Sequence, residues 1–155
     1  AKLLQKGYGV ILRPHPLNRD DKIMLKIKKK FLENKNFYYD VSSNYFKTYL
    51  SSSTLITDIS GTAYTYAFFT LNPVIFISSK KKEIIIKNNF NKDLNYFKNR
   101  NKIGLILLND KNLIKYVNKN ISNIKIRKSI IKEKKKIISG KKVLKRINYL
   151  FNKLI

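Results

Sequence analysis

Two short segments of the chain combine residue types that can bind a phosphate group. The first is Arg13-Pro14-His15-Pro16, which directly follows a β-rich run at residues 8–13. An arginine offers a forked donor for phosphate oxygens, and a histidine can donate a hydrogen bond or move a proton near neutral pH. The prolines restrict the backbone, so both side chains lose little entropy when they bind. A turn with an exposed arginine and a structural histidine is the alternative interpretation of this tetrapeptide.

The second segment, at residues 58–62, separates a strand-like apolar run from a helix-like apolar run. Gly61 lets a ligand approach the backbone closely. The amides of Gly61, Thr62 and Ala63 are expected to be unpaired at the helix N-terminus. Together with the helix dipole they would suit a pyrophosphate.

The side chains of the second segment support the same interpretation. Ser60 and Thr62 add hydroxyl donors. Asp58 would repel a phosphate directly, so we expect it to accept hydrogen bonds from the turn and hold its shape. An ordinary capped helix is the alternative for this segment.

Composition excludes several other kinds of site. The chain has no cysteine, which rules out disulfides, thiolate zinc ligands and a cysteine nucleophile. His15 is the only histidine, so no site can take two imidazoles from this chain. The nine acidic residues include no Asp-x-Asp pair of the kind that binds a metal.

The charge is strongly positive, with 34 Lys and Arg against 9 Asp and Glu and a net charge of +25. Such an excess favours a polyanionic partner: nucleic acid, an anionic membrane or a phosphorylated substrate. Abundant lysine, asparagine and isoleucine would also follow from an AT-rich genome. Most of the excess lies in residues 79–155, where Lys132, Lys134, Lys135 and Lys136 form either a face for anionic lipid or polyphosphate or a plain solvated helix face.

The elements that must position these segments alternate between strands and helices. A strand, turn, helix and strand at residues 54–77 form one βαβ unit. Alternation of this kind predicts an α/β fold with a parallel sheet. Residues 78–102 are the least regular part and are predicted to be a loop with short elements. Ser42 or Ser43 is predicted to cap a short helix. Strands are predicted at residues 8–13, 37–41, 54–58, 74–77 and 103–108, and helices at residues 19–34, 44–50, 63–71, 110–120, 126–138 and 141–155.

The order of the two segments resembles that in a known family. A strand leads into Arg-x-His-Pro, and 45 residues after Arg13 a second strand leads into Asp-x-Ser-Gly, a helix, Asn-Pro and a further strand. This order resembles the carboxy-terminal half of the CDP-glycerol glycerophosphotransferase family, the teichoic-acid-type polymerases and primases. The resemblance covers residues 8–77 and extends more weakly, through Gly104, to the end. Two positions depart from the family pattern: Gly61 replaces a serine, and Thr65 stands where the family often has an aspartate.

The resemblance implies a fold and a domain organisation. The fold would be a Rossmann-like parallel sheet flanked by helices, the C-terminal lobe of a GT-B-type transferase. Residues 1–155 would form a single donor-nucleotide-binding lobe, with residues 126–155 as closing helices. We expect an N-terminal acceptor lobe, which supplies the catalytic base, to be missing from this chain, and the fragment to be inactive alone.

The resemblance also implies roles for individual residues. The activity would be transfer of a glycerophosphate unit from a CDP-glycerol-like donor to a cell-surface polymer. No cofactor or bound metal is expected, because helix N-termini and basic side chains replace the metal. The implied site residues are His15 as the catalytic residue, Arg13, Ser60, Gly61 and Thr62 as phosphate or nucleotide ligands, and Asp58 and Pro16 as structural support.

Partners and location follow as further expectations. The partners would be a nucleotide-activated donor, a polymer or lipid-linked acceptor, the missing lobe and an anionic membrane surface. No secretion signal or long apolar segment is found, so we expect a cytoplasmic protein, peripheral at the inner face of the cell membrane.

Three alternatives stay open. The first is a CMP- or UDP-sugar glycosyltransferase of GT-B fold, acting in capsule or surface polysaccharide synthesis. The second is a non-catalytic structural domain. The third is a basic nucleic-acid-binding module, which is less favoured because its candidate stacking residues lie mainly on elements predicted to face the core. These residues are Tyr45, Phe46, Tyr49, Tyr64 and Tyr66.

Overall fold

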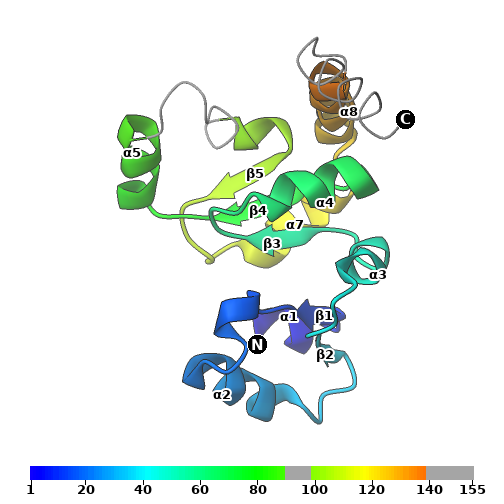
Figure 1. Ribbon diagram of the computed structural model, residues 1–155, viewed down its shortest axis with the longest axis vertical. Helices are drawn as coiled ribbons and strands as arrows, with labels where there is room; N and C mark the ends of the chain where they lie inside the picture. Colours follow the sequence, from blue (N-terminus) through cyan, green and yellow to red (C-terminus); the bar gives the residue numbers. More distant parts are fainter. Residues whose placement is uncertain (90–98, 139–155) are drawn as a thin grey trace, which may run out of the picture. The chain divides into compact units, whose positions relative to one another are not determined.

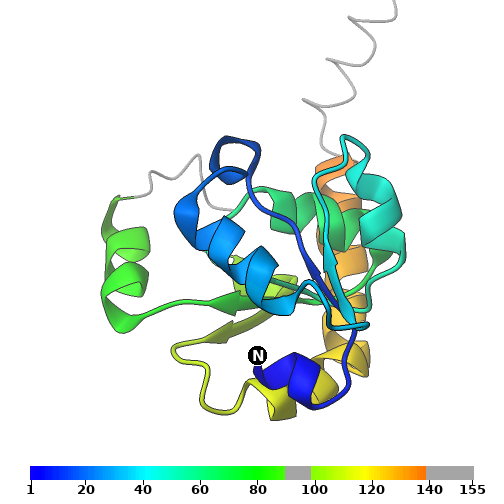
Figure 2. The same ribbon diagram turned by 90° about the horizontal axis from the view of Figure 1, so that it is seen from below.

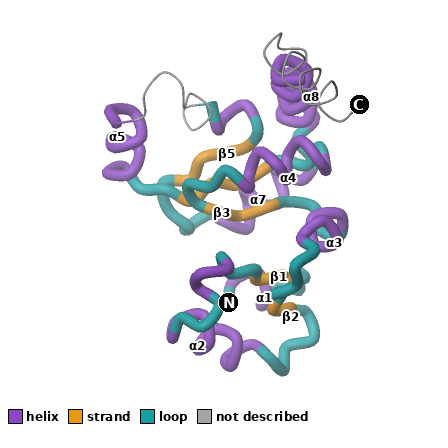
Figure 3. Tube along the Cα trace, viewed as in Figure 1, coloured by secondary structure: helices purple, strands orange, loops and turns teal. Residues whose placement is uncertain are grey.

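The computed structural model describes residues 1–89 and 99–138. These residues form two compact units, unit 1 up to residue 52 and unit 2 from residue 53 onward. Figure 3 shows strands and helices alternating along the trace, as an α/β fold requires. The five predicted strands are all found among the described residues, and every pairing is parallel.

Unit 1 contains a two-stranded sheet. Strand β1 (Val10–Leu12) pairs with β2 (Phe37–Tyr39), and the register places Leu12 beside Tyr39. Helix α2 (Lys22–Phe31) connects the two strands (Figure 1). The unit also contains α1 (Lys2–Gln5), the 3-10 turn η1 (Pro16–Asn18) and α3 (Tyr45–Leu50).

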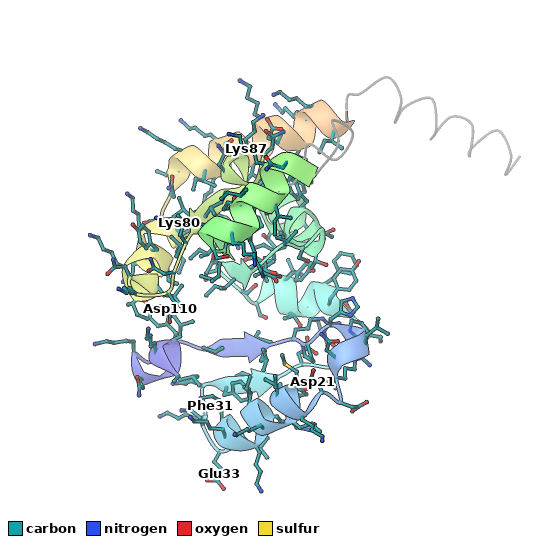
Figure 4. The ribbon with its side chains drawn as sticks, turned by 90° about the vertical axis from the view of Figure 1, so that its left-hand side faces the viewer. Asp21, Phe31, Glu33, Lys80, Lys87 and Asp110 are labelled. Atoms are coloured by element: carbon teal, nitrogen blue, oxygen red, sulfur yellow. The ribbon has the colours of Figure 1, made fainter. Side chains whose placement is uncertain are left out.

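Helix α2 has clear sequence determinants at its N-terminus and on its inner face. The Asp21 carboxylate accepts a 2.7 Å hydrogen bond from the Ile23 amide and caps the first turn. The Phe31 ring packs against Phe37 of β2 with centroids 5.7 Å apart. Figure 4 shows Asp21 near one end of the helix and Phe31 and Glu33 at the other. The helix therefore begins and ends inside its predicted range.

Unit 2 contains a three-stranded sheet in the order β3-β4-β5. The strands are β3 (Leu55–Thr57), β4 (Val74–Ile77) and β5 (Gly104–Leu107). Helices α4 (Thr62–Thr70) and α7 (Leu113–Ile121) lie on opposite faces of this sheet (Figures 1 and 2). Helix α8 (Ile124–Ile138) packs against α4 and against η3 (Arg100–Lys102).

The core of unit 2 is centred on β4. Val74, Ile75 and Phe76 are all fully buried. Successive residues of a strand point to opposite faces, so complete burial of all three means that both faces of β4 are covered. The matching sequence signal is the unbroken apolar run after Pro73, and β4 spans its predicted residues.

The buried side chain of Arg100 forms an ion pair that joins two elements of unit 2. Arg100 is 2% exposed and donates to both carboxylate oxygens of Glu83, at 2.7 and 2.9 Å. Its guanidinium also lies 5.4 Å from the centroid of the Phe76 ring. The pair joins η3 to α5 (Lys80–Asn89), in which Figure 4 labels Lys80 and Lys87.

Three predictions need correction. The strands form two sheets rather than one, of two and three strands. Residues 80–89 of the predicted loop form α5, because the Ser79 hydroxyl accepts the Lys82 amide and Glu83 pairs with the buried Arg100. Asn44, and neither Ser42 nor Ser43, caps α3, since its Oδ1 accepts the Phe46 amide at 3.1 Å.

The predicted closing helices are only partly visible. Helix α8 covers residues 124–138, close to the predicted 126–138, whereas the predicted helix at 141–155 lies outside the described residues. In the described part of the chain, no helix is long and apolar enough to cross a membrane.

Candidate functional site

The first candidate turn directly follows β1 in unit 1. Arg13 comes after the last residue of the strand, and its side chain is about a quarter exposed, at 24%. One terminal nitrogen lies 2.5 Å from Asp40 Oδ2, and the other donates to the Ser42 carbonyl at 2.5 Å. The guanidinium therefore joins the carboxyl end of β1 to the loop after β2.

Asp40 was not among the predicted site residues. It accepts hydrogen bonds from the Thr48 hydroxyl, the Ser42 amide and Arg13. Partial burial alone would raise the pKa of the Asp40 carboxyl, but the donors from Thr48, Ser42 and Arg13 together hold it well below its ordinary value. The sequence alone gives no signal for this pair, because positions 13 and 40 become neighbours only through the register that places Leu12 beside Tyr39.

His15 has a defined hydrogen-bonding role in the same turn. Its Nδ1 accepts the Leu17 amide at 3.3 Å and so caps η1, whose first residue is Pro16. A ring nitrogen that accepts a hydrogen bond carries no proton, so a neutral imidazole here carries its proton on Nε2. The residue is exposed, which leaves a donor at the surface of the turn. Arg13 and His15 both follow β1, and each makes its own set of contacts.

The second candidate turn lies between β3 and α4 in unit 2. Gly61 is the N-cap of α4 and has a φ of −62°, which any residue can adopt. A Cβ built on Gly61 would meet nothing within 4 Å. The fold therefore does not require glycine at this position, and the small residue leaves the backbone open to a ligand.

The amides of this turn are less available than predicted. The Ala63 amide donates to the Ser60 carbonyl at 3.2 Å, so the expectation that it is unpaired is wrong. It is wrong because the first turn of α4 tightens into i to i−3 bonding, a common way of satisfying helix-terminal amides. Within residues 1–89 and 99–138, no backbone partner is found for the amides of Gly61 and Thr62.

The side chains of the second turn are arranged as follows. No side-chain hydrogen bond caps α4 at Gly61, Thr62 is exposed and Ser60 is half-buried. Asp58 is 61% exposed and lies 3.5 Å from the Lys82 Nζ. In the described residues no hydrogen bond from the turn to Asp58 is found, contrary to the prediction, and the carboxylate lies beside Lys82 of α5.

Of the four lysines predicted to share a face of α8, Lys134 does not lie with the others. Lys134 Nζ donates to the Phe68 carbonyl at 2.7 Å, so it turns inward and satisfies a carbonyl in the last turn of α4. Lys132, Lys135 and Lys136 remain exposed. Positions 132 and 134 point differently because residues two apart on a helix lie on different faces.

The candidate stacking aromatics are mostly covered. Tyr66 is fully buried and Tyr49 is 5% exposed, whereas Phe46 is 41% exposed. The prediction that these residues face the core is thus confirmed for the two tyrosines.

The structure groups the predicted site residues into two separate turns. Arg13, His15 and Pro16 belong to unit 1, and Asp58, Ser60, Gly61 and Thr62 belong to unit 2. Each turn follows the carboxyl end of a parallel strand. Comparison of the chain with family models, with curated proteins and with solved structures gave no match.

Proposed function

We propose that this chain binds a nucleotide-activated donor of the CDP-glycerol type and serves a transferase that moves glycerophosphate onto a cell-surface polymer. In this proposal the parallel sheets belong to a Rossmann-like, GT-B-type donor lobe. The family resemblance of the two segments suggests the reaction.

The observation that carries the proposal is the position of the two turns. The turns containing His15 and Gly61 follow β1 and β3 at their carboxyl ends, where open α/β sheets bind ligands. The ordinary backbone and open surroundings of Gly61 add to this, since packing within the fold gives no reason for a glycine there.

The proposed chemistry breaks the phosphoanhydride bond of the donor. An acceptor hydroxyl attacks the phosphorus that bears the glycerol, a new P–O bond forms, and CMP departs with the electron pair of the broken bond. The hydroxyl proton passes to a general base in the acceptor lobe. The Nε2–H of His15 would donate to the departing phosphate and stabilise its charge.

Arg13 would bind the donor phosphate through the guanidinium N–H groups that Asp40 and Ser42 do not use. Its contacts with Asp40 and Ser42 occupy both terminal nitrogens, but a guanidinium has five N–H groups. Asp40 offsets part of its charge and fixes its position, so Arg13 would orient a phosphate more than attract one. The amides of Gly61 and Thr62 would bind phosphate oxygens at the start of α4.

The first test is calorimetric titration of the chain with CDP-glycerol, CMP, UDP-sugars and a short RNA, with binding rather than turnover as the readout. His15→Ala removes both the η1 cap and the Nε2 donor, whereas His15→Asn keeps an acceptor for the Leu17 amide and replaces the Nε2 donor by the amide group of a shorter side chain, which does not reach the same position. We expect both variants to bind CDP-glycerol about 10- to 100-fold more weakly, as for loss of one charge-assisted hydrogen bond.

The second turn is tested with a matched pair of variants. Gly61→Ala adds one methyl group in open space, whereas Gly61→Val adds a branched side chain beside the amides. We expect donor affinity to fall much more in Gly61→Val, with the fold unchanged in both.

The titrations also separate the alternatives. Selective cytidine-nucleotide binding that His15→Asn weakens supports the proposal. Selective UDP-sugar binding would point to a glycosyltransferase. RNA binding without nucleotide selectivity would refute a donor-binding role.

A further inference from the structure

The side of α8 that faces solvent carries a row of lysines with no acidic residue among them. Positions 125, 128, 132 and 136 are spaced by three or four residues and so lie along one side of a helix. The single acidic residue of α8, Glu133, is 17% exposed and pairs with Lys102 and Lys136. We call this surface the outer face of α8, and it includes the exposed residues Ile124, Lys125, Lys128, Ile131, Lys132 and Lys136.

The opposite side of α8 is firmly attached to unit 2. Ile130 is fully buried and Ile126 is 8% exposed. Arg127 donates to the Ile121 carbonyl at 3.1 Å, and Lys134 donates to the Phe68 carbonyl at 2.7 Å. These contacts fix the rotation of the helix about its axis, so the outer face is held toward solvent.

The outer face also contains aliphatic side chains. Ile124 is 67% exposed and Ile131 is 38% exposed. Helical spacing places them along one flank of the lysine row. A helix face that combines lysines with exposed aliphatic residues is typical of segments that lie on a membrane surface.

We propose that the outer face of α8 binds the surface of a membrane containing anionic lipids. Lys125, Lys128 and Lys132 supply charge, and no ion-pair partner is found for them in the described residues. Ile124 and Ile131 contact the boundary between headgroups and acyl chains. This proposal does not depend on the donor-binding turns.

The residue types favour a lipid surface over a nucleic acid. Proteins that bind single-stranded nucleic acid combine basic grooves with aromatic or arginine side chains on which bases stack. Helix α8 has no aromatic residue, and the side chain of its one arginine, Arg127, donates to backbone carbonyls. Lysine ammonium groups act as point charges, which suits a layer of mobile phosphate and carboxylate headgroups.

The test is cosedimentation of the full chain with vesicles of phosphatidylcholine alone, or with about 30% phosphatidylserine, at about 0.1 M salt. The variant Lys125→Gln/Lys128→Gln/Lys132→Gln removes three charges from the outer face. The matched control Lys6→Gln/Lys35→Gln/Lys47→Gln removes three exposed charges from scattered positions of unit 1. Circular dichroism checks that both variants fold.

The expected loss follows from the surface potential. Each lysine held near an anionic surface strengthens binding about fivefold, so the α8 variant should bind phosphatidylserine vesicles roughly 100-fold more weakly. The scattered variant should lose much less. A further variant, Ile124→Gln/Ile131→Gln, should bind the vesicles about tenfold more weakly while its affinity for a short RNA stays unchanged.

Three results would overturn the proposal. One is the absence of phosphatidylserine-dependent binding by the wild-type chain. Another is equal loss in the α8 and scattered variants, which would show that only net charge matters. The third is that the chain binds RNA more tightly than vesicles, and that this RNA binding is lost in the lysine variant but kept in the isoleucine variant. That result would identify a nucleic-acid surface.

Discussion

Gly104 is the residue at which one added carbon should damage the fold most. It pairs with Val74 across the β4–β5 ladder, and a Cβ built on it would lie 2.0 Å from the Val74 carbonyl oxygen and 2.7 Å from the carbonyl carbon. Ordinary contact begins at 3.4 Å, so β4 and β5 would have to separate locally by about 1.4 Å. Both atoms belong to the backbone, so no side-chain rotation can relieve the contact.

The expected loss in Gly104→Ala is at least about 3 kcal/mol, at or above the upper end of overpacking substitutions. With a urea dependence of about 1.5 kcal/mol per molar for a domain of this size, the unfolding midpoint of unit 2 should fall by roughly 2 M. The assay is urea unfolding followed by circular dichroism. Gly9→Ala is the matched control, because a Cβ at Gly9 would meet nothing within 4 Å.

A midpoint for Gly104→Ala within about 0.3 M of the Gly9→Ala midpoint would refute this reasoning. It would mean that the two strands do not approach as closely in solution. A loss of the cooperative transition would support the reasoning, since β4 is the central strand of its sheet.

Three further predictions concern individual polar groups. The pKa of Asp40 is lowered in the fold, so its contribution to stability is present above its ordinary pKa of 3.8 and is lost as the pH falls below that value. The difference between the urea midpoints at pH 7 and at pH 3 should therefore be larger in the wild type than in Asp40→Asn. Thr54→Val removes the hydroxyl that accepts a 3.1 Å hydrogen bond from Nδ2 of the fully buried Asn120. It should lower the free energy of unfolding by about 2 kcal/mol, measured by thermal or urea unfolding. Lys134→Met keeps the aliphatic stem but removes the donor to the Phe68 carbonyl, and should destabilise by about 1 kcal/mol, whereas Lys132→Met should change the urea midpoint little.

The sequence predicts the regular elements well where local signals agree. Pro73 and the apolar run that follows it predict the start and the residues of β4, and Asp21 marks the start of α2. Helix α5 was missed because residues 80–89 contain three consecutive lysines and three consecutive isoleucines, which give no helical periodicity. The pairing of Glu83 with Arg100, which joins α5 to η3, is a tertiary contact that a local pattern does not show.

The places of the two candidate turns after strands could be predicted from the sequence, but their hydrogen bonds could not. The sequence predicts one turn at His15 and another at Gly61, because residue types that are typical of turns follow the predicted strands there. The engagement of Arg13 by Asp40 depends on which strands are neighbours and in which register. The division of the strands between two sheets also depends on tertiary structure, because the sequence of a short parallel strand does not indicate which strand it pairs with.

The unequal cores of the two units have a consequence for amide exchange with solvent. Among the described residues, the buried hydrophobic side chains of unit 1 are Leu4, Phe37 and Tyr49, whereas those of unit 2 include the whole centre of β4. A two-stranded sheet over so small a core opens at a lower free energy than a three-stranded sheet covered on both faces. The amides of β1 and β2 should therefore take up deuterium well before those of β4, so the turn containing His15 belongs to the more readily opened part of the chain.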